Sequence, residues 1–124
     1  MKKVAGLLLC AALLAAVTGC GSGGISRSPD IRGNITSLRA SGESGGGTPG
    51  SILVEGTLQP DTKVDRASIR ITRDTLIFDD VAGRRTRTGF GALEVGETVE
   101  AIFTGPVLES YPVQATAAQV VILR

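Results

Sequence analysis

The sequence has no histidine, no tryptophan and only four aromatic side chains, three phenylalanines and one tyrosine. The absence of histidine removes the commonest general base and the commonest neutral metal ligand. No serine can therefore be paired with a histidine base, and no two carboxylates stand out as an acid–base pair. We expect no catalytic residue, no cofactor and no enzymatic activity.

The positions of the two cysteines also exclude thiol chemistry from the residues after Cys20. Cys10 lies inside an apolar run near the start of the chain, and Cys20 follows that run. The residues after Cys20 contain no cysteine, so they can form no disulfide. Because aromatic rings are scarce as well, the core of this part has to be built from isoleucine, valine, leucine and alanine.

No apolar run is long enough to span a bilayer. The run Val4–Val17 has 14 residues, whereas a transmembrane helix needs roughly 20. It follows Lys2 and Lys3, and small residues lead from its end to Cys20. A basic start, an apolar stretch and small residues at the cut are typical of a secretory signal peptide. One alternative is a transmembrane helix, but Gly-Ser-Gly-Gly follows in place of a basic stop-transfer cluster. The other is a plain secretory signal, which would need no cysteine at the cut.

The segment Val17-Thr18-Gly19-Cys20 resembles the lipobox of bacterial lipoproteins. The resemblance implies that the Cys20 thiol carries a diacylglycerol and that cleavage makes Cys20 the new N-terminus. It implies a partner, the membrane, and a location on its extracytoplasmic side. In double-membrane bacteria the residue after the lipidated cysteine carries a sorting signal, and by this resemblance Gly21 permits delivery to the outer membrane. The inner membrane remains the alternative location.

Three regions follow from this interpretation. Residues 1–19 are the signal peptide, residues 20–29 are the lipidated cysteine with a Gly/Ser tether, and residues 30–124 are one β domain. A nine-residue tether of this composition has a mean reach of roughly 15–18 Å. Without Lys2 and Lys3, 11 basic residues remain against 12 acidic ones, a net charge of −1. This balance argues against a nucleic-acid partner.

Short alternating strands separated by turns fill the β domain. The spacing predicts a long strand over 30–40 that bends at Gly33, a hairpin formed by 51–58 and 64–72, and strands over 97–104 and 113–123. Between them we expect a short apolar piece at 75–78, a polar loop over 79–87, and one turn of helix or an irregular lid over 90–96. Five strands with so little helix favour an all-β fold, a small five-stranded Greek-key barrel of OB type. A β-sandwich is the alternative.

The last strand needs a change of phase. Even alternation from Val113 would bury Gln119, whereas a β-bulge at Ala117-Ala118 turns Gln119 outward and lets Val120 reach the core. The same alternation predicts which side chains are buried and which are exposed. We expect burial of Ile69, Ile71, Val99, Phe103 and Val120, and exposure of Arg66, Arg70 and Glu100.

Two blocks of the domain, Leu93–Val99 and Glu109–Ala115, resemble a group of small bacterial lipoproteins. These are catalogued only as a domain of unknown function, with an OB-like β domain that ends in a Ser-Tyr-Pro-x-Gln type motif. Here the motif begins at Ser110-Tyr111-Pro112. The resemblance implies the fold and the location, and it supplies no activity.

Two groups of residues are candidate binding sites. Arg84, Arg85 and Arg87 suggest an anion site for phospholipid headgroups or an acidic glycan, because arginine forks suit phosphate. The alternative is a solvated loop with weak local ion pairs. Next to them, Asp79-Asp80 offers too few oxygen ligands for calcium, so we expect no metal.

The second candidate is the outer face of the hairpin, with Glu55, Arg66 and Arg70, together with Tyr111. OB folds commonly bind ligands on this face, but it has no aromatic rings for stacking bases. A cross-strand charge pattern is the alternative explanation for these residues. The alternative for Tyr111 is a packed ring that fixes the corner before the last strand.

These patterns predict a lipid-anchored, non-enzymatic envelope protein that binds a protein or an envelope component. One alternative is an OB-type binding module for an anionic small molecule or glycan. Another is a structural accessory subunit of an envelope complex.

Overall fold

A computed structural model of the chain describes residues 24–41 and 48–124. The predicted signal peptide with Cys20, and residues 42–47, lie outside the described residues. Seven strands and one short 3₁₀ turn make up the described part, and its fold is all-β. The strands are β1 (Ile31–Ala40), β2 (Gly50–Glu55), β3 (Arg66–Ile71), β4 (Leu76–Val81), β5 (Arg84–Thr88), β6 (Thr98–Leu108) and β7 (Val113–Leu123), and η1 (Phe90–Ala92) precedes β6.

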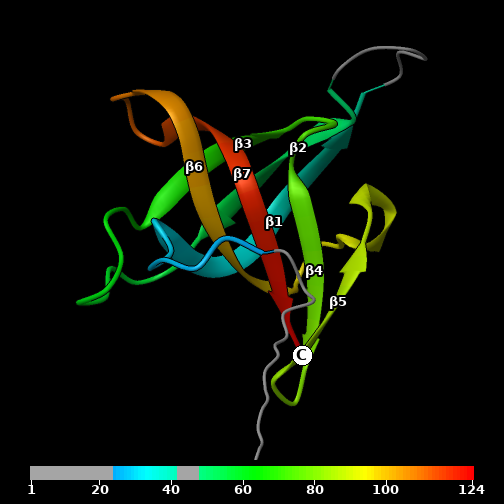
Figure 1. Ribbon diagram of the computed structural model, residues 1–124. Coiled ribbons are helices and arrows are strands. Elements are labelled where there is room, and N and C mark those ends of the chain that lie inside the picture. The colour runs from blue at the N-terminus through cyan, green and yellow to red at the C-terminus, as the bar shows by residue number, and fades with distance from the viewer. Residues whose placement is uncertain (1–23, 42–47) are drawn as a thin grey trace, which may run out of the picture.

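Five of the strands close into a barrel (Figure 1). β1 pairs antiparallel with β2, β2 with β3, and β6 with both β1 and β7. The closure comes from β3 and β7, which run parallel with Ile69 opposite Ala115. The barrel is OB-like, as the sequence predicted, and the sandwich alternative is wrong. The hairpin formed by β2 and β3 and the single turn of helix before β6 are confirmed as well.

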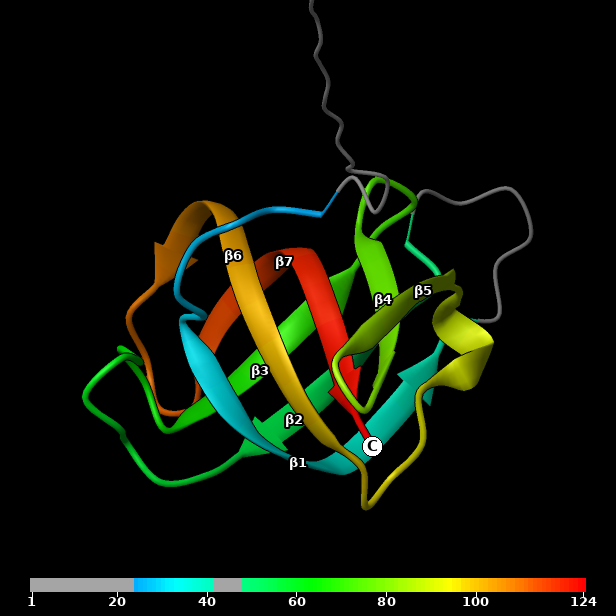
Figure 2. The same cartoon turned by 60° about the horizontal axis from the view of Figure 1, so that its bottom comes forward.

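β4 and β5 form a hairpin beside the barrel, so the prediction of a polar loop over 79–87 is wrong (Figure 2). The strands are joined by Ala82 and Gly83, whose φ angles of 54° and 85° suit a tight two-residue hairpin turn. β4 also pairs parallel with the second half of β7, where Phe78 lies opposite Val121. The sequence hid this hairpin because β5 is an edge strand with exposed charged side chains, and such a strand lacks apolar alternation.

The core lies inside the barrel and consists of aliphatic side chains with one phenylalanine, Phe103. The five side chains expected to be buried are all buried, and Arg70 is exposed. Arg66 and Glu100 are half-buried, which corrects the expectation for both. Their ion pairs explain the difference, because each packs against a partner on a neighbouring strand. Arg66 lies 3.6 Å from Glu55, and Glu100 lies 2.7 Å from Arg32.

The first strand bends as predicted, but the extra residue is Thr36, between Ile35 and Ser37, rather than Gly33. Gly33 serves a different purpose. A Cβ at this position would lie 2.4 Å from the carbonyl oxygen of Glu55, so the end of β2 approaches too closely for any side chain. The backbone of Gly56 completes this close crossing.

The predicted bulge in the last strand is confirmed. Ile102 lies opposite Gln119 whereas Phe103 lies opposite Ala117, so Ala118 is the extra residue. Ala117 and Val120 both face the core across this bulge, and Gln119 lies outside the core cluster. Gln119 is nevertheless only 2% exposed, because the segment before β1 covers it.

That segment, residues 24–30, lies against the outside of the barrel. The Gln119 amide pairs with the backbone of Ile25, accepting from its N–H at 2.6 Å and donating to its carbonyl at 3.3 Å. Further along, the Arg27 guanidinium donates to the Phe103 carbonyl. The buried Asp30 carboxylate accepts from the Phe103 N–H at 2.8 Å and has Arg27 and Lys63 3.4 Å away. The part of the predicted tether that the structure describes, residues 24–29, therefore packs against the barrel.

Candidate binding groove

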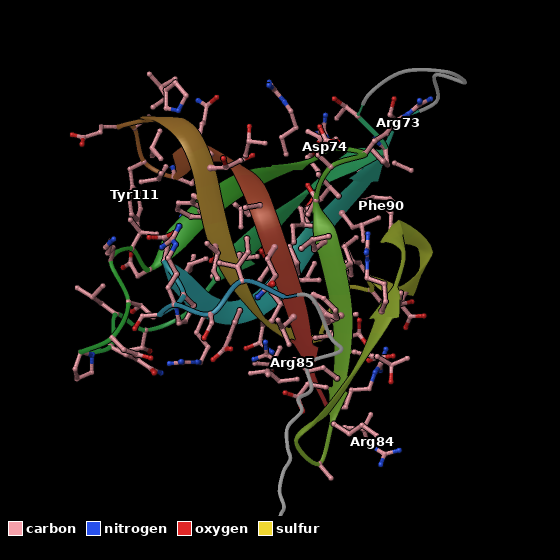
Figure 3. All side chains as sticks on the ribbon, viewed as in Figure 1. Arg73, Asp74, Arg84, Arg85, Phe90 and Tyr111 are labelled. Atoms are coloured by element: carbon pink, nitrogen blue, oxygen red, sulfur yellow. The ribbon has the colours of Figure 1, made fainter. Side chains whose placement is uncertain are left out.

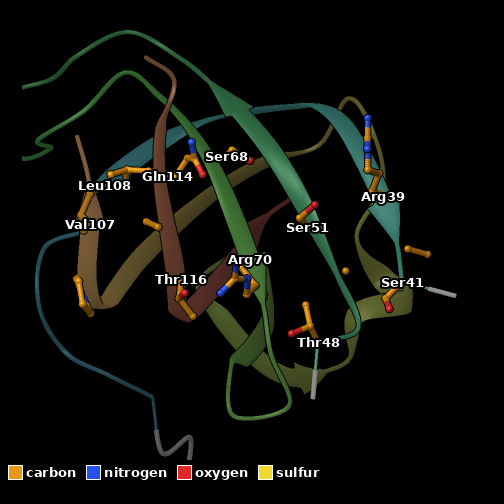
Figure 4. A pocket seen from close by; sticks show the side chains of 14 residues that line it. Arg39, Ser41, Thr48, Ser51, Ser68, Arg70, Val107, Leu108, Gln114 and Thr116 are labelled. Carbon is orange, nitrogen blue, oxygen red and sulfur yellow. The ribbon is translucent and has the colours of Figure 1, made fainter. Parts of the chain in front are cut away.

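A groove of about 640 Å³ crosses the outer face of β2, β3 and the first half of β7 (Figure 4). One side is closed by the end of β1 and the start of the loop after it, and the other by the apolar side chains of Val107 and Leu108. This is the face, with its flanking loops, that OB barrels generally use for ligands. Its polar lining consists of Arg39, Ser41, Thr48, Ser51, Ser68, Arg70, Gln114 and Thr116.

Strand register sets these side chains in rows. Arg39 lies opposite Ser51, Ser51 opposite Arg70, and Arg70 opposite Thr116, so four strands contribute to one row. The next row on the same face contains Ser68 and Gln114. Neighbouring strands lie about 4.8 Å apart, which places the Cα atoms of the two arginines about 10 Å from each other. Two guanidinium groups, with the Ser51 hydroxyl between their strands, thus face one groove.

The electrostatic character of the groove comes from these two arginines. Among the described residues, no aspartate or glutamate lines it, and neither Arg39 nor Arg70 has an ion pair. Other arginines of the barrel are neutralised by carboxylates, as Arg66 is by Glu55. A fixed positive charge without an internal partner attracts an anionic ligand.

Only three of the four residues predicted to share a binding face lie together in the structure, and Arg70 is the exception. Glu55 accepts from the Thr36 hydroxyl at 2.8 Å and pairs with Arg66, whose guanidinium lies 5.7 Å from the centre of the Tyr111 ring. This chain of contacts matches the cross-strand charge pattern. Arg70 lies further along β3, in the groove. Of the four residues, Arg70 alone therefore presents an unpaired charge to the groove.

Tyr111 does not pack its ring at the corner before the last strand, so that alternative from the sequence is wrong. Its side chain is 68% exposed, and it projects from the turn between β6 and β7 (Figure 3). The Tyr111-Pro112 peptide bond is cis, and the Ser110 hydroxyl donates to the Pro112 carbonyl at 2.7 Å. Backbone geometry and this hydrogen bond, rather than a buried ring, shape the corner.

The structure places Arg84, Arg85 and Arg87 on β5 instead of in a loop. Because side chains alternate along a strand, Arg84 points to the opposite face from the other two. Arg85 lies 3.4 Å from Asp80, and the guanidinium of Arg87 lies 6.0 Å from the centre of the Phe78 ring. The three arginines therefore do not converge on a single anion.

The acidic residues near this hairpin are held by arginines. Asp80 pairs with Arg85, and Asp79 accepts from Arg124, which raises the pKa of that guanidinium. In the part of the chain that the structure describes, no group of three or more acidic, histidine or cysteine side chains could hold a metal ion. That part also contains no helix of the length and apolarity needed to cross a membrane.

The sequence pointed to Arg70 but missed Arg39. Arg39 lies near the end of β1, 31 residues before Arg70, so only the register through Ser51 shows that they share a groove. The strand alternation of 64–72 and the bend in β1 were available from the sequence. The phase of Arg39 after the bulge at Thr36 was not, because it depends on where the bulge lies.

The chain was compared with protein-family models, with curated proteins and with solved structures, and none of the three comparisons found a match. The site therefore has to be interpreted from its own geometry.

Proposed function

We propose that this protein is a non-catalytic, lipid-anchored binding module of the bacterial envelope, and that its groove binds an acidic glycan. The observation that carries the proposal is the row of Arg39, Ser51 and Arg70, in which two unpaired arginines flank a hydroxyl. Guanidinium groups form paired hydrogen bonds with carboxylate, sulfate or phosphate groups. Their spacing of about 10 Å suits a ligand that carries more than one anionic group.

The remaining lining supports a saccharide rather than another anion. Hydroxyl and amide groups both donate and accept hydrogen bonds, as the hydroxyls of a sugar do. Ser68, Gln114 and Thr116 supply such groups along the floor of the groove. None of the described lining residues is aromatic, so stacked nucleobases would find no partner there. The use of this face by OB barrels for oligosaccharides is a fold-level analogy that agrees with the chemistry.

The anchor is supported by the sequence. A basic start, a 14-residue apolar run and the lipobox-like Val17–Cys20 favour lipidation of Cys20 and a position on the extracytoplasmic side of a membrane. Resemblance to small bacterial lipoproteins with an OB-like domain favours the same interpretation. A Cys20→Ala variant should lose incorporation of labelled palmitate, and equal labelling of the variant would contradict the anchor.

Glycan binding is tested with the lipidated protein in nanodiscs. We expect uronic-acid oligosaccharides to bind and neutral oligosaccharides of equal length to bind far more weakly, measured by calorimetry. The double variant R39A/R70A should lose affinity at least about tenfold, because a hydrogen bond to a charged group contributes about 1.5–3 kcal/mol. The matched variant R84A/R87A removes two arginines from another face and should bind as the parent does. Equal binding of acidic and neutral chains, or an unaffected R39A/R70A, would contradict the proposal.

A further inference from the structure

Gly24, the first described residue, lies against the outside of the barrel on the N-terminal side of β1. A Cβ at Gly24 would lie 3.0 Å from the Oε1 atom of Gln119 and 3.4 Å from the Phe78 ring. Gly24 thus rests on β4 and β7, and the paired hydrogen bonds between Ile25 and Gln119 hold the next residue there. Gly24, which we call the exit point because Cys20 lies before it in the sequence, is therefore held at a fixed place on the surface of the molecule.

Little chain separates this point from the lipid. Gly24 is four residues after Cys20, and four residues of fully extended chain span at most about 14 Å. A lipid on Cys20, which is part of the function proposed above, would keep the exit point within that distance of the headgroups. The side of the barrel around Gly24 then lies within reach of the membrane.

Two arginines of β5 lie near the exit point. Arg85 lines a groove of about 480 Å³ together with Gly24 and its neighbours, and Arg87 lies over Phe78, the same ring that Gly24 approaches. Arg84 is exposed beside the hairpin turn (Figure 3). All three belong to β5: Arg85 and Arg87 lie on the face toward Gly24, and Arg84 lies on the other face of the same strand beside the hairpin turn.

The carboxylates of the same hairpin do not cancel this charge. Asp79 and Asp80 are half-buried and are engaged by Arg124 and Arg85. Arg84 and Arg87 have no ion pair among the described residues and remain exposed. They are free to meet an external anion.

From this geometry we infer that the β4–β5 hairpin docks on anionic phospholipid headgroups and gives the anchored barrel one orientation. Basic side chains near an anionic membrane surface are attracted within about a Debye length, about 8–10 Å at moderate salt. The short link to Cys20 lets β5 come within this range. Val81, which is 54% exposed at the hairpin turn, adds an apolar side chain at the same contact.

The orientation has a consequence for the glycan groove. The segment from Gly24 crosses the outer side of β6 and β7, which lie in front in Figure 1, whereas β2 and β3 lie behind. The groove that carries Arg39 and Arg70 opens on the outer face of β2 and β3. Docking of the β4–β5 hairpin would therefore turn the groove away from the bilayer, toward envelope polymers.

The inference is tested with lipidated full-length protein in vesicles. After lipidation of Cys20 the mature chain has no other thiol, so T86C on β5 and Q114C in the groove each accept one fluorophore. Vesicles contain phosphatidylglycerol and a headgroup spin label that quenches nearby fluorophores. We expect strong quenching at position 86 and little at position 114. Phosphatidylcholine vesicles, or high salt, should reduce the quenching at 86.

Charge variants complete the test. R84E/R87E should lower the ratio of docked to undocked protein by roughly 20-fold or more, since each basic residue contributes about 1 kcal/mol near such a surface. R39E/R70E makes the same change of charge on the far side and should leave quenching at position 86 unchanged. Equal quenching at 86 and 114, or no response to R84E/R87E, would overturn the inference. Flotation with the vesicles reports the anchor separately, so loss of flotation in every sample identifies failure of the anchor itself.

Discussion

At the scale of single residues, Gly33 and Gln119 hold contacts in the barrel that an apolar side chain could not make. Gly33 lets the end of β2 cross β1, with the Glu55 carbonyl only 2.4 Å from where a Cβ would be. The sequence showed that a glycine interrupts the first strand and assigned it to the bend. The real reason is a contact with β2, about 20 residues away, which no local pattern of the first strand contains.

Gly33→Ala should therefore be strongly destabilising. Backbone atoms of Glu55 and Gly56 cannot move without disturbing the pairing of β1 with β2, so we expect a loss of about 1–3 kcal/mol in the free energy of unfolding. Urea denaturation measures it. Gly91→Ala is the matched control, because nothing lies within 4 Å of a Cβ at that position. Similar stabilities of the two variants would show that the crossing relaxes easily.

Gln119 is a second residue whose role depends on a distant partner. The sequence predicted that a bulge turns it out of the core, and this is confirmed. It did not predict burial, because the Gly/Ser-rich composition before β1 favoured a free tether. Composition describes how freely a segment moves alone. It does not describe what happens when an amide offers both a donor and an acceptor to the backbone.

Gln119→Ala should remove both hydrogen bonds and leave the Ile25 N–H without its partner. We expect a loss of about 1–3 kcal/mol in stability, with faster hydrogen exchange at Ile25. Gln114→Ala on the same strand is the control, since that side chain is exposed and its loss should change stability by less than about 0.5 kcal/mol. Unchanged exchange at Ile25 in the Gln119 variant would show that the segment is held by other contacts.

At the scale of elements, the sequence predicted the barrel strands well and the edge hairpin poorly. The β2–β3 hairpin and β7 are half-buried strands, in which alternation of apolar and polar residues reports the two faces. β5 pairs on one side only and carries Arg84, Arg85, Thr86 and Arg87, so its exposed face left no apolar pattern to find. Charges on an edge strand also discourage pairing with another chain. This role explains why charged side chains are tolerated on β5.

The candidate groove was predictable to the extent that it depends on alternation within one strand. Arg70 faces outward because Ile69 and Ile71 face inward, and this could be predicted from the sequence. Arg39 joins it only through the register of β1 against β2 after the bulge at Thr36. Register depends on the loop between these strands and on packing across the barrel, which the sequence does not specify locally.

At the scale of the whole molecule, charge is divided between sides that face different surroundings. Among the described residues, arginines without an ion pair occur in the groove and on β5, whereas an ion-pair network links parts of the barrel wall elsewhere. Arg32 on β1 is the centre of that network. It lies 2.7 Å from Asp61 in the turn between β2 and β3, and 2.7 Å from Glu100 on β6. One side chain thus joins three parts of the barrel wall.

This network predicts how stability depends on pH. The hydrogen bond from Arg32 holds the pKa of Asp61 below its usual value, so the folded state binds fewer protons there than the unfolded chain does. The stabilising contribution is complete above the unfolded pKa of about 3.9 and is lost as pH falls through the lower folded pKa. The free energy of unfolding should therefore decrease below about pH 4.

Urea denaturation between acid and neutral pH measures this dependence. Asp61→Asn removes the titrating group, and we expect the variant to be less stable than the parent at neutral pH and to lose less stability on acidification. Because Asp61 is largely exposed, the difference should be modest and should shrink at high salt. Asp74→Asn, an exposed aspartate outside this network, is the control and should keep the parent's profile. If the Asp61 variant follows the parent's profile through the acid range, the prediction is wrong. Backbone pairing and the Arg32–Glu100 pair would then hold the barrel wall, and Asp61 would contribute no stability.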